Sequence, residues 1–160
     1  MTEDTDRAAP DAATGGSRAR VPRAAALLGW AGLIPFVGLA ALLHLGPEGG
    51  RLLAAHMLAF YGVAILSFLG GCRWGFAAAG LGEGPALRPL VLSVVPALYA
   101  WAAMPLGVPD ALVFLAAGFV ALLGADISLT RAGGAPAWWP RLRWPLSVGA
   151  AGSLIAGWLA

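Results

Sequence analysis

The sequence predicts an all-α membrane protein: a polytopic bundle of five transmembrane helices, with the N-terminus inside and the C-terminus outside. Three observations lead to this prediction: an apolar composition, five long apolar runs, and arginines concentrated on one side. Of the 160 residues, 59% are hydrophobic and only 11% are charged, whereas an ordinary soluble domain carries roughly 25% charged residues. A soluble domain of this size could not bury so much apolar surface, because small domains keep a large surface for their volume.

The chain divides into a polar tail and an apolar domain. Residues 1–21 contain acidic residues, arginines and the pair Gly15-Gly16, with few large apolar side chains. Such a segment cannot bury enough surface to offset the entropy of ordering it. We therefore expect a disordered cytoplasmic tail at 1–21, followed by a transmembrane domain at 22–160.

The first predicted helix covers 24–45 and follows Pro22, a residue favoured at helix starts. At the helical rise it would be about 33 Å long, enough to cross a hydrocarbon core of about 30 Å. A Gly- and Pro-rich turn at 46–51 separates it from the second predicted helix at 52–74.

The remaining three helices are predicted at 89–106, 110–128 and 144–160. Pro96 interrupts the third and should kink it, which membrane helices tolerate when neighbours satisfy the freed carbonyl. Asp110 is suited to cap the start of the fourth. The fifth run lies at the short end of the range for a membrane span.

The arginines predict the orientation, since cytoplasmic segments of membrane proteins carry the excess of positive charge. With the N-terminus inside, only Arg51 falls on the outer side. The other arginines all fall on the inner side: Arg7, Arg18, Arg20, Arg23, Arg73, Arg88, Arg131, Arg141 and Arg143. Because these arginines sit at helix ends and form no single patch, a nucleic-acid partner is not expected. The predicted location is a bacterial inner membrane, with a cytoplasmic N-terminus and a periplasmic C-terminus.

One cluster of polar and aromatic residues stands out at the predicted inner face. Asp126 could pair with Arg73 or Arg143, because a carboxylate at membrane depth is costly and normally has a partner. The cluster is either a site for an anion, a proton or a partner protein, or a structural ion pair with interfacial charges that snorkel. Its members are Arg73, Asp126, Trp138, Trp139, Arg141 and Arg143.

No metal site or cofactor is predicted. His44 and His56 fall near the predicted outer face and are weak candidates for a metal or haem, because a third ligand is missing. The single cysteine, Cys72, allows no intrachain disulfide and behaves as a small hydrophobe.

Small residues recur at four-residue spacing in two of the predicted helices. Such stripes let helices approach closely, and here we expect them to pack the bundle internally rather than to form a dimer face. The residues concerned are Gly70, Gly71, Gly75, Gly149, Ser153 and Gly157.

Three segments, 28–36, 61–75 and 136–143, are together similar to those of a known family. They resemble the transmembrane protein 69-like family, a domain-of-unknown-function family of small multi-pass membrane proteins. The resemblance covers about residues 22–160 and implies an inner-membrane protein without assigning an activity. The family often has histidine at the position of Arg73, which speaks against proton or metal chemistry at that residue here.

The function predicted from these features is that of a non-enzymatic scaffold, assembly or accessory factor. Its partners would be the lipid bilayer and another membrane protein, with the oligomeric state open. A small transporter or channel component is the alternative, since such proteins bind near the midplane at broken helices, as Pro96 and Ser93 would allow. A haem- or metal-binding protein using His44 and His56 is a more distant one.

Overall fold

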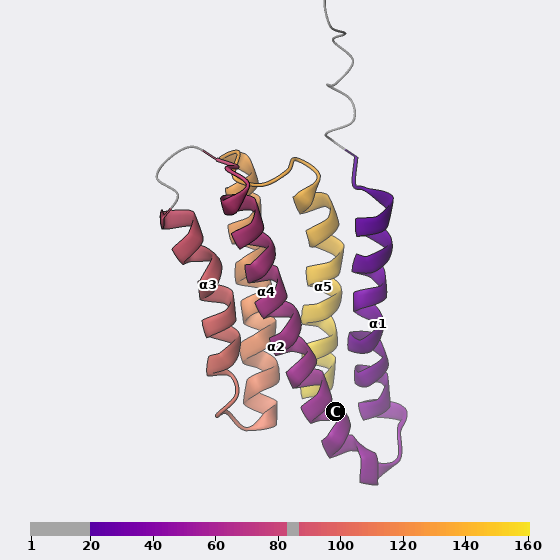
Figure 1. The fold of residues 1–160 in the computed structure, drawn as a ribbon. Coiled ribbons are helices and arrows are strands. Elements are labelled where there is room, and N and C mark those ends of the chain that lie inside the picture. Colours follow the sequence, from indigo (N-terminus) through magenta and orange to yellow (C-terminus); the bar gives the residue numbers. More distant parts are fainter. Residues whose placement is uncertain (1–19, 83–86) are drawn as a thin grey trace, which may run out of the picture.

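A computed structural model of the chain describes residues 20–82 and 87–160. These residues form five α-helices and no strand, which confirms the predicted all-α fold. The helices are α1 (Arg23–Leu45), α2 (Glu48–Ala78), α3 (Leu87–Ala102), α4 (Val108–Arg131) and α5 (Trp139–Trp158). They lie side by side and alternate in direction, so the described chain begins and ends at opposite ends of the bundle (Figure 1). Most of the predicted tail, 1–19, lies outside the described residues.

Proline positions account for the main differences between predicted and observed helix ends. Helix α2 begins at Glu48 rather than Leu52, directly after Pro47. Helix α5 begins at Trp139 rather than Trp144, because Pro140 occupies a first-turn position that needs no backbone N–H. Helix α3 ends at Ala102, short of the predicted 106, since Pro105 cannot continue it. The connection between α4 and α5 is therefore shorter than the predicted helix bounds of 128 and 144 imply.

The core is built mainly from leucine and alanine side chains, with α2 touching all four other helices. Phe36 of α1 packs edge-on against Phe119 of α4, with ring centroids 5.6 Å apart, and against Tyr61 of α2 at 4.9 Å. Leu58, Leu115 and Leu154 are fully buried around them. The middle of the bundle is thus filled by close-packed apolar side chains.

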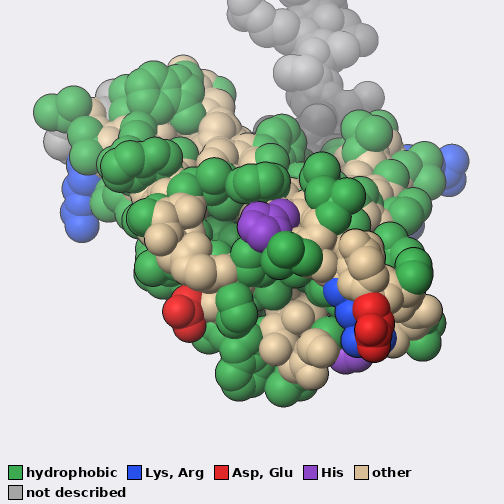
Figure 2. Space-filling view, turned by 90° about the horizontal axis from the view of Figure 1, so that it is seen from below, with side chains coloured by type: hydrophobic (Ala, Val, Ile, Leu, Met, Phe, Trp, Pro, Cys, Tyr) green, Lys and Arg blue, Asp and Glu red, His purple; other side chains and the backbone are tan. Residues whose placement is uncertain are grey.

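The outer surface of the bundle is also apolar. Three of the described helices, α1, α2 and α4, are long and apolar enough to cross a membrane, and α3 is a shorter apolar helix. Hydrophobic side chains also cover most of the end at which α1 joins α2 (Figure 2). A bilayer is the environment in which such a surface carries no penalty, because lipid tails are as apolar as the side chains that face them.

Small residues permit close helix contacts at some of the predicted positions but not at others. A Cβ at Gly70 would meet the Ser93 carbonyl oxygen of α3 at 2.6 Å, so α2 and α3 touch there backbone to backbone. On α5, a Cβ at Gly149 would meet Leu33 at 2.8 Å and one at Gly157 would meet Leu58 at 2.6 Å.

The remaining predicted packing positions have other surroundings. A Cβ added at Gly71 or at Gly75 would meet no atom within 4 Å, so these two glycines do not serve a close approach. Ser153 is buried, and its hydroxyl donates to the Gly149 carbonyl oxygen at 2.8 Å. The glycine stripe expected on α2 is therefore reduced to Gly70, since the other two glycines lie on faces of the helix that no described neighbour covers.

Candidate functional site

The candidate site starts with the turn that joins α4 to α5. Gly133 adopts a left-handed conformation (φ 75°), which glycine reaches without a steric penalty. The Gly134 N–H donates to the Leu129 carbonyl at 2.9 Å and the Gly133 N–H to the Thr130 carbonyl at 3.0 Å. These two bonds form a Schellman motif that ends α4. The chain then turns back into α5, which places the last turns of α4 against the first turns of α5.

This turn brings Asp126 of α4 opposite Arg143 of α5. The Arg143 Nε donates to Asp126 Oδ2 at 2.9 Å. From α2, the Arg73 Nη1 donates to Asp126 Oδ1 at 2.8 Å. The sequence left open which arginine pairs with Asp126; in the structure both do, one on each carboxylate oxygen. We call Arg73, Asp126 and Arg143 the triad.

The triad lies inside the bundle rather than on its surface. Asp126 is 0% exposed and Arg143 is 3% exposed, while the Arg73 side chain is 10% exposed. One carboxylate between two guanidinium groups gives the triad a formal charge of +1. In a region of low dielectric each ion pair is strong, but the surplus positive charge has no counter-ion among the described residues.

Aromatic side chains cover the triad toward the helix ends. Trp139 is 6% exposed and stacks edge-on against Phe76 of α2, with centroids 5.0 Å apart. The Arg143 Cζ lies 5.9 Å from the centroid of the Trp139 ring, within the range of a cation–π contact. Trp138 is half-buried and packs against Trp139, whereas Arg141 is exposed. The predicted surface of arginines and tryptophans is thus mostly interior, because α2, α4 and α5 close over it.

Three buried polar atoms next to the triad lack a hydrogen-bond partner within the described part of the chain. They are the Arg143 Nη2, the Trp139 Nε1 and the Ser147 Oγ, all on consecutive turns of α5. A buried donor without a partner is costly, and for a charged group the cost is larger. These atoms therefore mark a place where a polar group from outside the chain could bind.

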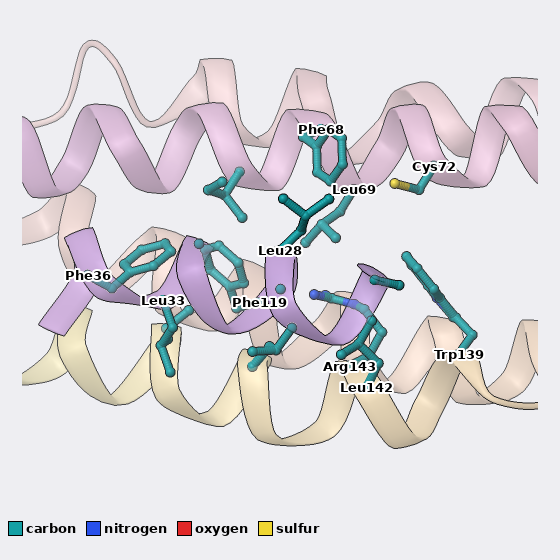
Figure 3. A pocket seen from close by; sticks show the side chains of 16 residues that line it. Leu28, Leu33, Phe36, Phe68, Leu69, Cys72, Phe119, Trp139, Leu142 and Arg143 are labelled. Atoms are coloured by element: carbon teal, nitrogen blue, oxygen red, sulfur yellow. The ribbon is translucent and has the colours of Figure 1, made fainter. Parts of the chain in front are cut away.

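Arg143 and Trp139 also line an apolar cleft of about 350 Å³ between α1, α2 and α5. Its walls are aliphatic and aromatic side chains such as Leu28 and Phe36, and Cys72 contributes from α2 (Figure 3). The Arg143 side chain is directed among these lining residues (Figure 3). We call this cleft the slot. Its volume lies within the range typical of small-molecule sites.

The two histidines do not form a common site. The His44 Nε2 donates to the Ala156 carbonyl oxygen at 2.9 Å, which links α1 to the end of α5. The His56 Nδ1 donates to the Leu52 carbonyl oxygen of its own helix at 2.8 Å. Within residues 20–82 and 87–160 no group of three His, Cys, Asp or Glu side chains could hold a metal ion.

Comparison with known proteins identifies the family. Residues 21–159 match the family model described as "Protein of unknown function (DUF3429)". The chain belongs to this family. This DUF3429 protein is similar to transmembrane protein 69 of Xenopus tropicalis, with 38% identity over 144 residues that cover 84% of this chain and 53% of the relative. The resemblance predicted from three segments of the sequence is confirmed.

A second relative of this DUF3429 protein is transmembrane protein 69 of Mus musculus, 38% identical over 87 residues that cover 52% of this chain and 34% of the relative. The chain thus spans about half or less of the length of these relatives. No solved structure matches it. The family is one of transmembrane proteins whose function is not established, so any activity has to be argued from the structure.

Sequence reasoning locates the triad but misses the slot. The sequence pattern marks Cys72 only as a small hydrophobe, and it does not single out Gly29 and Gly32 of α1, which line the slot. The available signal is the stripe of small residues Ala25, Gly29 and Gly32 on one face of α1. On its own that stripe predicts tight packing. That holds at Gly29, where a Cβ would meet Leu146 at 2.7 Å, whereas a Cβ at Gly32 would meet only the Tyr61 hydroxyl, at 3.8 Å.

Proposed function

We propose that the chain spans a bacterial inner membrane five times, with its N-terminus in the cytoplasm and its C-terminus in the periplasm. Helices α3 and α5 would be about 24 Å and 30 Å long at the helical rise. They run alongside the three long apolar helices and pack against them, so they would lie at the same membrane depth (Figure 1). An odd number of spans puts the two termini on opposite sides.

The arginines support this orientation. Among the described residues, Arg51 lies at the end where α1 joins α2, and every other arginine lies at the opposite end. Those arginines are Arg20, Arg23, Arg73, Arg88, Arg131, Arg141 and Arg143. The positive-inside rule then assigns the arginine-rich end to the cytoplasm.

Within this topology the chain would act as a non-enzymatic scaffold or accessory factor for another membrane protein. The observation that carries this proposal is the combination of a closed triad with an apolar interior. The triad ties α2, α4 and α5 together at one end, and leucine and alanine side chains with two phenylalanines fill the bundle between that end and the other. Such a body is suited to hold its shape and present surfaces to a partner, rather than to cycle between conformations.

The side chains that a transporter could use at the midplane are engaged within the bundle. The Ser93 hydroxyl donates to the Leu90 carbonyl of its own helix at 2.6 Å, and Pro96 packs beside Gly70 where α2 and α3 meet. Transporters usually hold their substrate at the midplane on unwound or broken helices. These contacts therefore favour the accessory role over a transport role.

Partner capture from native membranes tests the proposal. Trp74 and Trp144 are exposed at the cytoplasmic end, 49% and 60% respectively, and Trp101 is 70% exposed near the other end of the bundle. After crosslinking and mild detergent extraction, the full chain should co-purify with one defined membrane protein. Trp74→Ala with Trp144→Ala should reduce that yield, whereas Trp101→Ala should not. Solute movement by the purified chain alone in liposomes would overturn the accessory role.

A further inference from the structure

The slot has a shape and a polarity that together point to one kind of ligand. The buried residues of α1 are Phe36, Ala40 and Leu43, all in its second half. The first half of α1 has no buried residue, although it touches α5 closely at Gly29, where a Cβ would meet Leu146 at 2.7 Å. The slot opens beside this half of the helix. In the proposed topology this half lies in the cytoplasmic leaflet, so the slot is accessible from lipid.

The slot is elongated along the helices. On α1 its lining runs from Ala25 to Phe36, and on α5 from Trp139 to Ala150. Each of these stretches corresponds to about 16 Å at the helical rise. The walls are apolar over this length except near Arg143. A flexible apolar chain lying parallel to the helices would therefore fit between them.

The polar end of the slot determines the headgroup. The Arg143 guanidinium uses its Nε for Asp126, while its Nη2 is buried without a partner within the described chain. The triad carries a surplus charge of +1, so an anion at Nη2 would both satisfy the donor and neutralise the cluster. Charge-assisted hydrogen bonds of guanidinium to carboxylate are among the strongest available.

We propose that the slot binds a long-chain carboxylate, with the carboxylate on Arg143 and the alkyl tail between α1, α2 and α5. Arg143 lies four residues after the start of α5, hence about 6 Å below the helix end. A carboxylate joined directly to its chain reaches this depth. The phosphate of a diacyl phospholipid stays nearer the headgroup level, separated from its chains by the glycerol.

Cys72 offers a direct readout, because it lines the slot and is the single cysteine of the chain. The full-length protein in phosphatidylcholine nanodiscs is treated with N-ethylmaleimide, and modification is followed by intact mass. Added palmitate should slow the labelling of Cys72 in a saturable way. Methyl palmitate has the same tail without the charge. Equal protection of Cys72 should therefore require about a tenfold higher concentration of the ester than of palmitate.

Two glycines of α1 provide a matched pair of variants for direct binding of radiolabelled palmitate. A Cβ at Gly32 would have only the Tyr61 hydroxyl within 4 Å, at 3.8 Å, and Gly32 lines the slot. Gly38, on the same helix, has nothing within 4 Å and does not line it. Gly32→Leu should fill the slot and reduce palmitate binding about tenfold or more, whereas Gly38→Leu should bind as the unmodified chain does.

The headgroup contact is tested separately. Arg143→Gln should remove the preference for palmitate over its methyl ester, and the glycine pair keeps the proposal falsifiable if this variant does not fold. Equal protection of Cys72 by the acid and the ester would overturn the proposal. So would equal palmitate binding by Gly32→Leu and Gly38→Leu, or recovery of a diacyl phospholipid in place of a fatty acid from the delipidated protein by native mass spectrometry.

Discussion

The triad gives the sharpest stability prediction, because one isosteric change removes its single negative charge. Asp126→Asn keeps the size and shape of the side chain at a position that is 0% exposed. Two guanidinium groups would then face one amide, whose oxygen accepts from only one of them. The other arginine would face the amide NH₂, another donor, and the cluster would carry a formal charge of +2.

Asp126→Asn should lower the unfolding free energy because it leaves buried positive charge without a counter-ion. Breaking a buried ion pair by removing one partner costs about 3–5 kcal/mol. Arg143, at 3% exposure, cannot move to water without unpacking α5, whereas the Arg73 side chain, at 10%, is closer to the surface. We therefore assign most of the loss to Arg143 and expect Asp126→Asn to lower the unfolding free energy by about 3 kcal/mol.

Reversible unfolding in mixed detergent and SDS micelles, followed by far-ultraviolet circular dichroism, measures this difference. Asp110→Asn is the matched control, since it is the same substitution on the same helix at an exposed first-turn position. Asp110→Asn removes only the favourable interaction of the carboxylate with the helix dipole, so its unfolding free energy should fall by about 0.3–1 kcal/mol. If both variants lose the same small amount, the triad does not hold the bundle together.

Three further predictions concern packing, hydrogen bonding and topology. Gly70→Ala should destabilise the protein by about 1–3 kcal/mol in the same assay, because its Cβ meets the Ser93 carbonyl oxygen, whereas Gly71→Ala should be neutral; equal effects would contradict the α2–α3 contact. His44→Ala should cost about 0.5–1.5 kcal/mol through the lost bond to Ala156, without any change in bound metal by elemental analysis. In a Cys72→Ser background, the Ala160→Cys variant should react with an impermeant maleimide from the periplasmic side; reaction only from the cytoplasm would refute five spans.

The sequence predicts the fold class and the location of the triad from simple physical rules. Apolar runs separated by Gly and Pro turns indicate the helices, and the excess of arginine at alternate ends places Arg73 and Arg143 near Asp126. These patterns do not specify how each helix is rotated about its own axis. That rotation decides whether one arginine or both reach the carboxylate, and it depends on how α2 and α5 pack against α4.

Other features depend on details of packing that a pattern does not contain. The sequence predicts Trp138 and Trp139 together at the inner face, but Trp138 is half-buried whereas Trp139 is buried against Phe76 and Arg143. A tryptophan at the start of a helix looks the same in the sequence whether it faces the lipid interface or the bundle. Only the face of α5 that it occupies decides between the two. Likewise, Gly70 and Gly71 are indistinguishable in sequence, yet one touches α3 and the other faces outward.

The triad and the proposed ligand are coupled through one side chain. Arg143 contacts Asp126 with its Nε, it lines the slot, and its Nη2 has no partner among the described residues. In Asp126→Asn a bound carboxylate would replace the missing negative charge, so ligand binding and folding would be linked more strongly than in the unmodified chain. Palmitate should therefore raise the unfolding free energy of Asp126→Asn more than that of the unmodified protein, and methyl palmitate should raise both equally. Equal stabilisation of the two proteins by palmitate would mean that the carboxylate does not bind at Arg143, even if the slot holds its tail.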